Sequence, residues 1–288
     1  MRRLFGISCL CLMAAVLAAP PTAGAQGAAL KLFGGYNSFA AGDVDSGLKG
    51  PLDFITALGE AFGWTATGEF KSLNSAWDVG GDFVFYFTPN FGLGLGAGYI
   101  QTLPSKSQTD FTHSGLTPWS YSVDPKASAI PIRASLYVSI PMGPVVSLTF
   151  HGGVSYYLAK FQWAQRVGSG TSWDQEEIKT DGKGIGFHGG VGLELNLTPN
   201  LSLVVEGTGR LAKIDDFTGT STITSSGGGT TTDNGTLYYY EFSAGTLGTL
   251  GVLAFSDTAP SGSGFNNVRK AKVDFSGLAA RAGLMFRF

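Results

Sequence analysis

The last twelve residues of the chain, Gly277 to Phe288, constrain the fold more than any other stretch. A β-strand sends alternate side chains to opposite faces. One face of this stretch is wholly apolar, whereas the interleaved positions include Arg281 and Arg287; the apolar set is Leu278, Ala280, Ala282, Leu284, Phe286 and Phe288. A strand of about ten residues that is apolar outside and polar inside is the repeating unit of a membrane β-barrel.

Seven earlier stretches alternate in the same way, at 29–39, 77–87, 91–101, 130–140, 145–161, 185–197 and 201–211. Tight turns rich in Pro, Asn and Gly join three pairs of them at 88–90, 141–144 and 198–200, where these residues supply turn dihedrals. The other connections are long, about 40–76, 102–129, 162–184 and 212–277. The pattern predicts an all-β, antiparallel, up-and-down transmembrane β-barrel of eight strands.

The alternation of short turns and long connections also predicts an orientation. Outer-membrane barrels have short periplasmic turns and longer extracellular loops. With eight strands, both termini fall on the short-turn side. We therefore expect periplasmic termini and a location in the outer membrane of a Gram-negative-type bacterium, with outer-membrane lipid around the strands.

Charged residues within these strands fall on the face opposite the apolar set. A basic side chain facing lipid at the bilayer midplane costs about 2–4 kcal/mol, so this face must point inward. We predict a lumen charge network that fills the interior, made of Lys31, Asp78, Asp82, Arg133, Glu194, Glu206, Arg210 and Arg281. Within it, we expect Glu206 to pair with Arg281 on the neighbouring strand, and Arg133 to reach Asp82.

Strand 91–101 lies between the strands of Asp82 and Arg133 and carries only glycine on its inward face, at Gly92, Gly94, Gly96 and Gly98. Two explanations remain open. The missing side chains leave a trough through which Arg133 reaches Asp82, or the glycines ease the curvature of the sheet.

Residues 1–25 fit a secretory signal peptide, which leaves 26–288 as one barrel domain with long extracellular loops. Arg2 and Arg3 precede an apolar run, and Ala23-Gly24-Ala25 has the small-x-small pattern of a cleavage site. Both cysteines lie inside this segment, so we expect no disulfide and no thiolate metal site. The remaining chain is mildly acidic and shows no cofactor motif. We therefore expect no cofactor, no bound metal and no nucleic-acid partner.

The first long connection contains a predicted helix at 51–62, which has Pro51 in its first turn and Gly63 as its stop. Its apolar residues share one face: Phe54, Ile55, Leu58 and Phe62. This face packs on neighbouring loops or the barrel rim, the reading we favour, or forms a lid or a lipid-surface helix.

The last long connection combines a Thr/Ser/Gly-rich segment, 218–235, with two apolar runs in 236–255. Its composition predicts a mobile loop at 218–235. The runs 237–242 and 252–255 predict a hairpin. We favour a hairpin above the membrane; the alternative is two further wall strands, which would make ten. Asp174, Glu176 and Glu177 bind a cation or form a solvated acidic loop, and we favour the loop because they lack EF-hand spacing.

The histidines give no catalytic arrangement. Lipid-modifying barrel enzymes place a serine two residues from a histidine on one strand, but here Gly153 and Gly190 stand two residues after His151 and His188. Ser114 directly follows His113. By parity His151 and His188 point inward, where we expect them to join the lumen network rather than catalyse a reaction.

The topology, the two Thr-Pro-Asn turns and the terminal aromatic resemble the small eight-stranded outer-membrane barrels, the OmpA/OmpX/OmpW-like group. The resemblance implies that Phe286 and Phe288 form a C-terminal signal for the barrel assembly machinery. It leaves function open, since the group includes adhesins, anchors, small-solute channels and enzymes. We expect a non-catalytic structural or surface-interaction protein with an extracellular ligand at its long loops. The alternatives are a narrow channel for small or apolar solutes and, less favoured, a lipid-modifying enzyme.

Overall fold

The computed structural model describes residues 27–288, so the predicted signal peptide lies outside the described part. The fold is all-β and antiparallel, with one α-helix and one short 3-10 helix, Gly245–Leu247, in the described range. No helix in residues 27–288 is long and apolar enough to cross a membrane.

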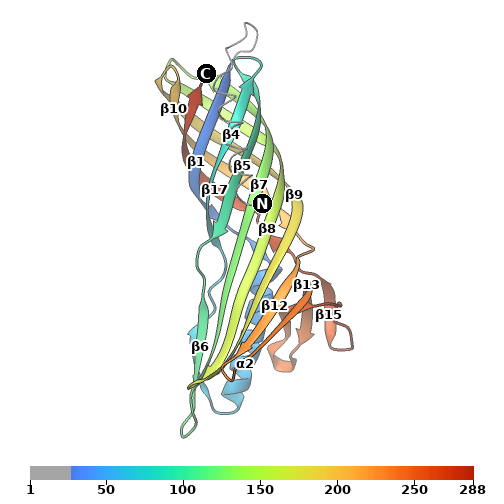
Figure 1. Ribbon diagram of the computed structural model, residues 1–288. Coiled ribbons are helices and arrows are strands. Elements are labelled where there is room, and N and C mark those ends of the chain that lie inside the picture. The colour runs from blue at the N-terminus through green and yellow to red at the C-terminus, as the bar shows by residue number, and fades with distance from the viewer. Residues whose placement is uncertain (1–26) are drawn as a thin grey trace.

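Eight strands form a closed ring in which each pairs antiparallel with two neighbours. The first and last of them, β1 and β17, pair with each other and close the ring (Figure 1). The ring strands are β1 (Ala28–Ser38), β4 (Ser75–Tyr86), β5 (Phe91–Thr102), β7 (Trp119–Pro141), β8 (Val146–Ser169), β9 (Ser172–Thr198), β10 (Leu201–Leu211) and β17 (Gly277–Arg287). Residue 28 and the C-terminus lie together at the short-turn end.

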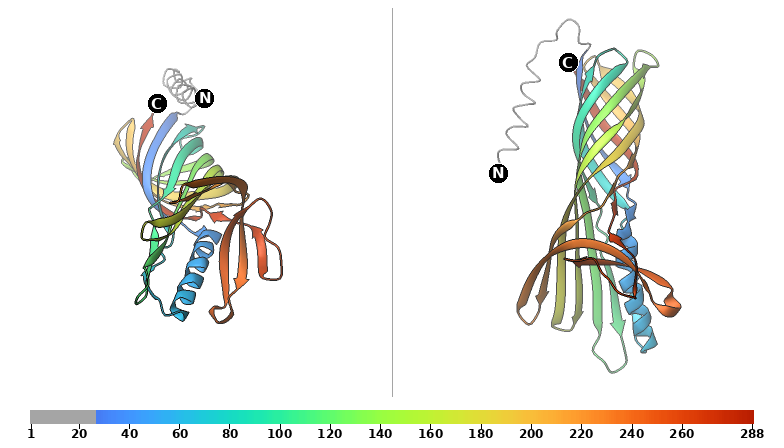
Figure 2. Two further views of the ribbon diagram at one scale, coloured as in Figure 1. Left: turned by 60° about the horizontal axis from the view of Figure 1, so that its bottom comes forward. Right: turned by 90° about the vertical axis from the view of Figure 1, so that its right-hand side faces the viewer.

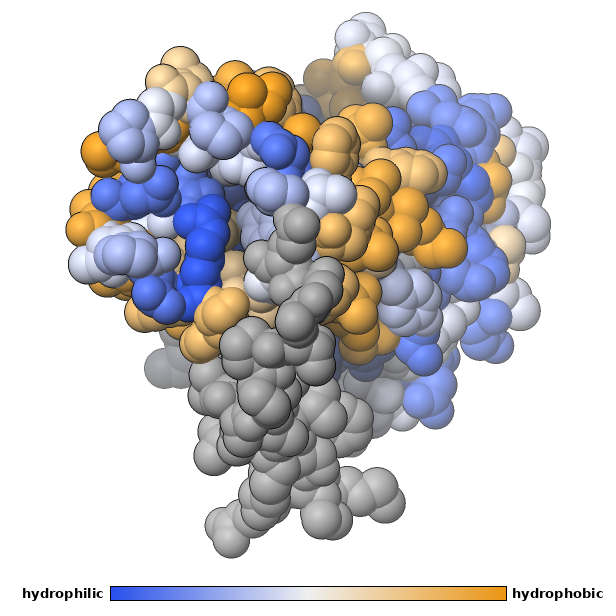
Figure 3. Space-filling view, turned by 90° about the horizontal axis from the view of Figure 1, so that it is seen from above, coloured by the Kyte–Doolittle hydropathy of each residue, from blue (hydrophilic) through white to orange (hydrophobic). Residues whose placement is uncertain are grey.

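The ring separates apolar from charged side chains as the alternation predicts. Leu95, Ile185 and Leu278 point outward and are largely exposed, whereas Lys31 and Asp82 are buried inside. Figure 3 looks onto the short-turn end, where blue hydrophilic residues gather at the left and orange hydrophobic residues lie around and beside them. The exposed outer face suits lipid rather than water.

Three strands are far longer than expected: β7, β8 and β9 have 23, 24 and 27 residues. The predicted long loop 162–184 is therefore wrong, because β8 and β9 stay paired up to Ser169 and Ser172 around a two-residue turn. Beyond the ring the same inward positions become apolar, with Phe161, Trp163 and Ile178 buried. The sequence pattern of apolar outward positions therefore does not predict this part of β8 and β9.

Past the end of the ring that lies away from the C-terminus, the long strands belong to a second sheet in the order β14-β13-β12-β9-β8-β7-β6-β3. Figure 2 shows this part of the molecule below the ring. Its shorter strands are β3 (Thr65–Glu69), β6 (Ser107–Thr112), β12 (Thr218–Ser225), β13 (Gly229–Ser243) and β14 (Thr249–Ser256); β15 (Phe265–Lys270) pairs with β13. We call this sheet, β15 and helix α2 the extension. The connections predicted at 102–129 and 212–277 are therefore largely strands.

The Thr/Ser/Gly-rich segment 218–235 is a β-hairpin, not the irregular loop its composition predicts. β12 pairs with β9 along its whole length, and β13 pairs with β12. The backbone pairing with β9 gives these small residues a structure that composition does not reveal. β13 and β14 pair with each other outside the ring, so 236–255 adds no wall strands.

Helix α2 (Asp43–Ala61) begins eight residues before the predicted start, and Pro51 lies inside it rather than in its first turn. Gly47 and Gly50 weaken the helix signal, but they let the helix pack closely on β14. A Cβ at Gly47 would lie 2.9 Å from Leu253 N, and one at Gly50 would overlap Gly251 O. Tertiary packing thus overrides local propensity.

The apolar residues of α2 divide between two faces. Leu48 and Leu52 are buried in the core of the extension and Ile55 packs against it. Phe54, Leu58 and Phe62 are exposed. The expected shared face of the predicted helix therefore only partly packs on its neighbours.

A three-stranded sheet continues three ring strands inward at the extension end. β2 (Ala41–Gly42), β11 (Lys213–Ile214) and β16 (Val273–Asp274) follow or precede β1, β10 and β17 and keep their order. Here Phe39 and Phe275, which adjoin the paired strands β1 and β17, meet Tyr157 of β8 from the opposite side of the ring. The aromatic centroids of Phe39 and Tyr157 lie 5.2 and 6.3 Å from that of Phe275. These residues and the small sheet, which we call the apolar layer, cross the interior.

Candidate functional site

The centre of the ring holds a buried lysine between two carboxylates. Lys31 Nζ on β1 lies 3.0 Å from Glu206 Oε2 on β10 and 3.4 Å from Asp82 Oδ2 on β4. All three side chains are almost fully buried. Because a buried charge is costly unless it is paired and hydrogen-bonded, this arrangement links strands on both sides of β1.

Asp82 also accepts hydrogen bonds from Arg133 Nη2 and from the Tyr137 hydroxyl, each at 2.8 Å. Gly96 of β5 stands directly between Asp82 and Arg133 in the strand register. A Cβ at Gly96 would overlap Asp82 Oδ1. The trough explanation of the glycine row therefore has a physical basis, since only glycine leaves room for these side chains to meet.

The same arrangement of an acid, a glycine and an arginine recurs farther along β1. Gly35 of β1 pairs with Asp78 on β4 and with Arg281 on β17. Arg281 Nε donates to Asp78 Oδ2 at 2.8 Å, and a Cβ at Gly35 would lie 2.7 Å from Arg281 Cγ. The chain thus twice places an acid, a glycine and an arginine in direct register across three neighbouring strands.

This second arrangement gives Arg281 a closer partner than the expected Glu206. Glu206 and Arg281 are register neighbours, as expected, but their nearest charged atoms are 3.8 Å apart. The hydrogen-bonded partner is Asp78. Sequence reasoning missed it because the pair spans the ring closure between β1 and β17; the glycine pair Gly34-Gly35 was the available signal.

Arg210 and Glu194 lie apart from this centre. Arg210 Nη1 donates to Asn37 Oδ1 at 2.6 Å, and Nε to the Phe275 carbonyl at 2.5 Å. Arg210 therefore holds the segments that bend into the apolar layer instead of pairing with an acid. Glu194, near the short-turn end, accepts from Arg287 Nη2 at 2.7 Å.

The two inward histidines complete the interior. His188 lies between two serines, with Nε2 2.8 Å from Ser135 Oγ and Nδ1 2.8 Å from Ser155 Oγ. His151 stacks on Tyr137, with its Nδ1 3.7 Å from Glu206. Sequence reasoning missed the serines because they come from β7 and β8.

A serine next to a histidine is the pair that nucleophilic catalysis uses, with a third group orienting the base. Here both ring nitrogens of His188 face serine hydroxyls, so no carboxylate orients the ring. Ser135 and Ser155 are buried, and the apolar layer lies on the extension side of them. The geometry favours a structural hydrogen-bond network over acyl transfer.

The extension carries a polar groove of about 440 Å³ on β6, β7, β8 and β9. Its lining includes Lys106, Gln108, Asp110, Arg166 and Trp173, and the Arg166 guanidinium lies 4.4 Å from the Trp173 ring centroid. Concave sites with a few placed polar groups are typical of ligand binding. This groove is the second candidate site.

The acidic residues of 174–177 lie on β9 rather than in a loop. Glu176 accepts from Ser221 at 2.6 Å, and Glu177 pairs with Lys179 at 2.8 Å. Within residues 27–288, no group of three or more His, Cys, Asp or Glu side chains has the arrangement to hold a metal ion.

The C-terminal aromatics lie on the outer edge of the ring at the short-turn end. Phe286 pairs with Leu30, and the Phe288 backbone N–H donates to the Ala28 carbonyl at 2.8 Å. Phe288 is half-exposed. Its role in assembly remains a prediction.

The sequence matches the family model described as "Outer membrane protein beta-barrel domain" over residues 9–248. No curated protein sequence matches. Similar solved structures include Ail of Yersinia pestis with sucrose octasulfate (12% identity, 91% of this chain and 99% of that chain, TM-score 0.29). Another is the outer membrane protein AlkL (12% identity, 94% of this chain and 94% of that chain, TM-score 0.30). A third is the outer membrane protease OmpT of Escherichia coli (11% identity, 94% of this chain and 99% of that chain, TM-score 0.26).

Proposed function

Because the chain belongs to the outer membrane protein β-barrel domain family, we propose that it is a non-catalytic surface-interaction protein of the outer membrane. The extension lies outside the cell and both termini are periplasmic. The ring anchors the extension, and the extension presents a binding face. The sequence alternatives, a narrow solute channel and a lipid-modifying enzyme, are weaker.

The observation that carries this proposal is that two separate groups of side chains fill the interior of the ring. The charge network around Lys31 joins strands across the ring, and the apolar layer crosses the interior toward the extension. An eight-stranded ring is only wide enough for side chains to fill it. A solute would have to displace paired, buried charges and then an apolar contact, which disfavours conduction.

Conductance tests the choice between anchor and channel. The purified protein in planar bilayers should give no steady conductance at porin level, and vesicles that contain it should not take up small sugars. A large open-channel porin is the positive control. Steady conductance, or uptake of a solute by vesicles, would refute the anchor and favour the channel.

The polar groove supports a binding role for the extension. Two tryptophans and two basic side chains in one groove provide both stacking surface and hydrogen-bond donors. Arrays of neutral and acidic oligosaccharides should give signals with the purified protein that fall at least tenfold for Trp173→Ala and Arg166→Ala. Lys160→Ala, outside the groove, should leave them unchanged. Signals equal in all variants would contradict this site.

Protease accessibility tests the orientation. A cleavage site inserted at the tip between β12 and β13, residues 226–228, should be cut when protease is added to intact cells. The same site inserted at the short turn 88–90 should be cut only after the outer membrane is opened. The reverse pattern would place the extension in the periplasm.

A further inference from the structure

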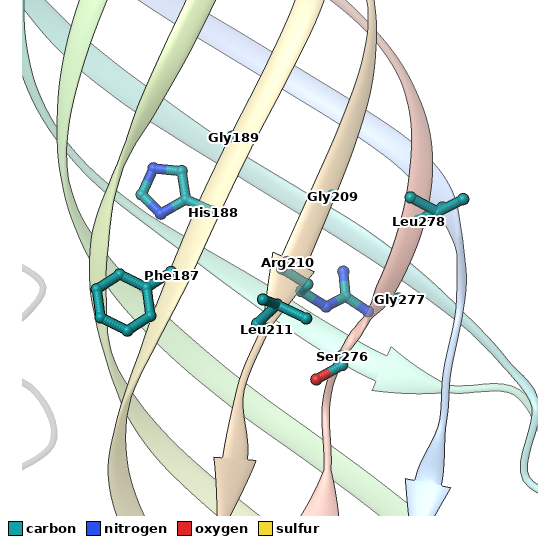
Figure 4. Close-up of a pocket in the computed structure, with 9 residues that line it drawn as sticks. All are labelled: Phe187, His188, Gly189, Gly209, Arg210, Leu211, Ser276, Gly277 and Leu278. Atoms are coloured by element: carbon teal, nitrogen blue, oxygen red, sulfur yellow. The ribbon is translucent and has the colours of Figure 1, made fainter.

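The outer face of the ring has an apolar groove of about 420 Å³ between β9, β10 and β17 (Figure 4). Phe187, Leu211 and Leu278, one from each strand, lie at its rim and are 60–73% exposed. Between them the lining includes Gly189 and Gly209. The rim residues belong to the lipid-facing apolar set, so the groove opens toward the membrane rather than toward water.

The groove exists because two wall strands leave the ring at this height. β10 ends at Leu211 and the next residue, Ala212, is buried; β17 begins at Gly277, after the fully buried Phe275. The Phe275 N–H donates to the Ala212 carbonyl at 2.8 Å, which holds both segments inward. β9 continues past this height as one uninterrupted strand. The wall is therefore recessed beside β9, and the glycines supply no side chain to fill the recess.

The depth of the groove places it in one leaflet. Gly209 lies eight residues from Leu201, the first residue of β10 at the short-turn end. Eight residues at about 3.4 Å each, tilted by about 45°, rise about 19 Å within an apolar band about 25 Å tall. The groove thus faces the leaflet that adjoins the extension.

The polar groups behind the groove are already satisfied. Arg210 donates to Asn37 and to the Phe275 carbonyl, and both nitrogens of His188 face serine hydroxyls. Ser276 Oγ, also in the lining, accepts a hydrogen bond from the Ala212 N–H at 3.0 Å. The groove therefore offers an occupant an almost wholly apolar surface. Such a surface suits a hydrocarbon chain better than a polar headgroup.

We propose that this groove seats one hydrocarbon chain of a membrane lipid from the leaflet next to the extension. An unfilled apolar recess loses the dispersion contacts of its lining, and water does not stabilise an apolar recess. Its volume lies at the lower end of the range for small-molecule sites, which suits a single chain. The bound chain seals the wall where β10 and β17 leave it.

Photolabelling tests the proposal. The protein is placed in nanodiscs of phosphatidylcholine with a diazirine on the acyl chain, irradiated, digested and analysed by mass spectrometry. Labelling at Phe187, Leu211 and Leu278 should exceed that at Val79 and Ile132 at least threefold. Val79 and Ile132 are also lipid-facing and lie at similar depth, seven and nine residues from their short-turn strand ends.

A matched pair of variants isolates the groove. Gly209→Leu fills it, since a Cβ there meets only Leu278 Cδ2, at 3.5 Å. Gly207→Leu adds the same bulk to the same face two residues away, where nothing lies within 4 Å. Gly209→Leu should lower rim labelling at least threefold, and Gly207→Leu should not. Equal labelling of rim and comparison residues in the wild type would overturn the proposal, whatever the variants do.

Discussion

The stability of the ring should depend strongly on Arg281 and Asp78 being present together. Asp78 is 2% exposed and Arg281 10% exposed in their side chains, and both hydrogen bonds from Arg281 reach Asp78 Oδ2. Breaking a buried pair by removing one partner costs about 3–5 kcal/mol. Arg281→Met should therefore lower the free energy of unfolding by this amount, because no other basic side chain in residues 27–288 lies within salt-bridge distance of Asp78.

The variant that lacks both charges tests whether the loss of stability in Arg281→Met comes from breaking the pair with Asp78. Replacing both charges by apolar groups is often neutral, so Arg281→Met with Asp78→Leu should lie within about 2 kcal/mol of the wild type. The cycle should then give a coupling energy of about 3 kcal/mol or more. Glu206 is 3.8 Å from Arg281 without a hydrogen bond, so the cycle with Glu206→Gln should give a smaller value.

Urea unfolding of the protein in lipid vesicles measures these energies. Tryptophan fluorescence follows the transition, and the heat-dependent shift on a gel reports the folded fraction independently. Additive single and double variants would refute the reasoning, as would a larger coupling to Glu206 than to Asp78.

Three further results are expected. Gly96→Ala should destabilise the ring by about 1–3 kcal/mol or more in the same urea assay, because the added methyl overlaps Asp82 and overpacking has this cost. Gly207→Ala, where nothing lies within 4 Å of the added methyl, is the control. Equal stability of the two variants would contradict the trough explanation. Gly50→Ala should separate α2 from β14, so limited proteolysis should cut the extension while the ring keeps its heat-dependent gel shift; an unchanged digest would oppose this. Deleting Phe288 should lower the folded fraction in cells, and an unchanged fraction would remove it from the assembly signal.

The strands within the membrane were predictable because lipid imposes one rule on their outer face. The expected stretch 201–211 coincides with β10, and 277–288 differs from β17 by one residue. Each lipid-facing position must be apolar, so the pattern is visible without knowledge of any partner strand.

The extension was not predictable by that rule, because the environment changes while the strand continues. On β8, Tyr156 and Leu158 face outward in the ring, and the next outward residue is Lys160, whereas the inward positions change from Ser155 to Phe161. The parity of the strand is unchanged, but water replaces lipid outside and an apolar core replaces the charged interior. The outward positions change from apolar to polar and the inward positions from polar to apolar. In the sequence, a strand that continues therefore looks as if it ended there.

The sequence by itself determined which face of each membrane strand carries charge, and that those charges must neutralise one another inside. Only the tertiary structure decided the partners. Arg281 meets Asp78 because ring closure places β17 beside β1 and Gly35 leaves the space between them. Side-chain parity is a local property of a strand, whereas register, closure and the space left by a glycine depend on strands that are far apart in the chain.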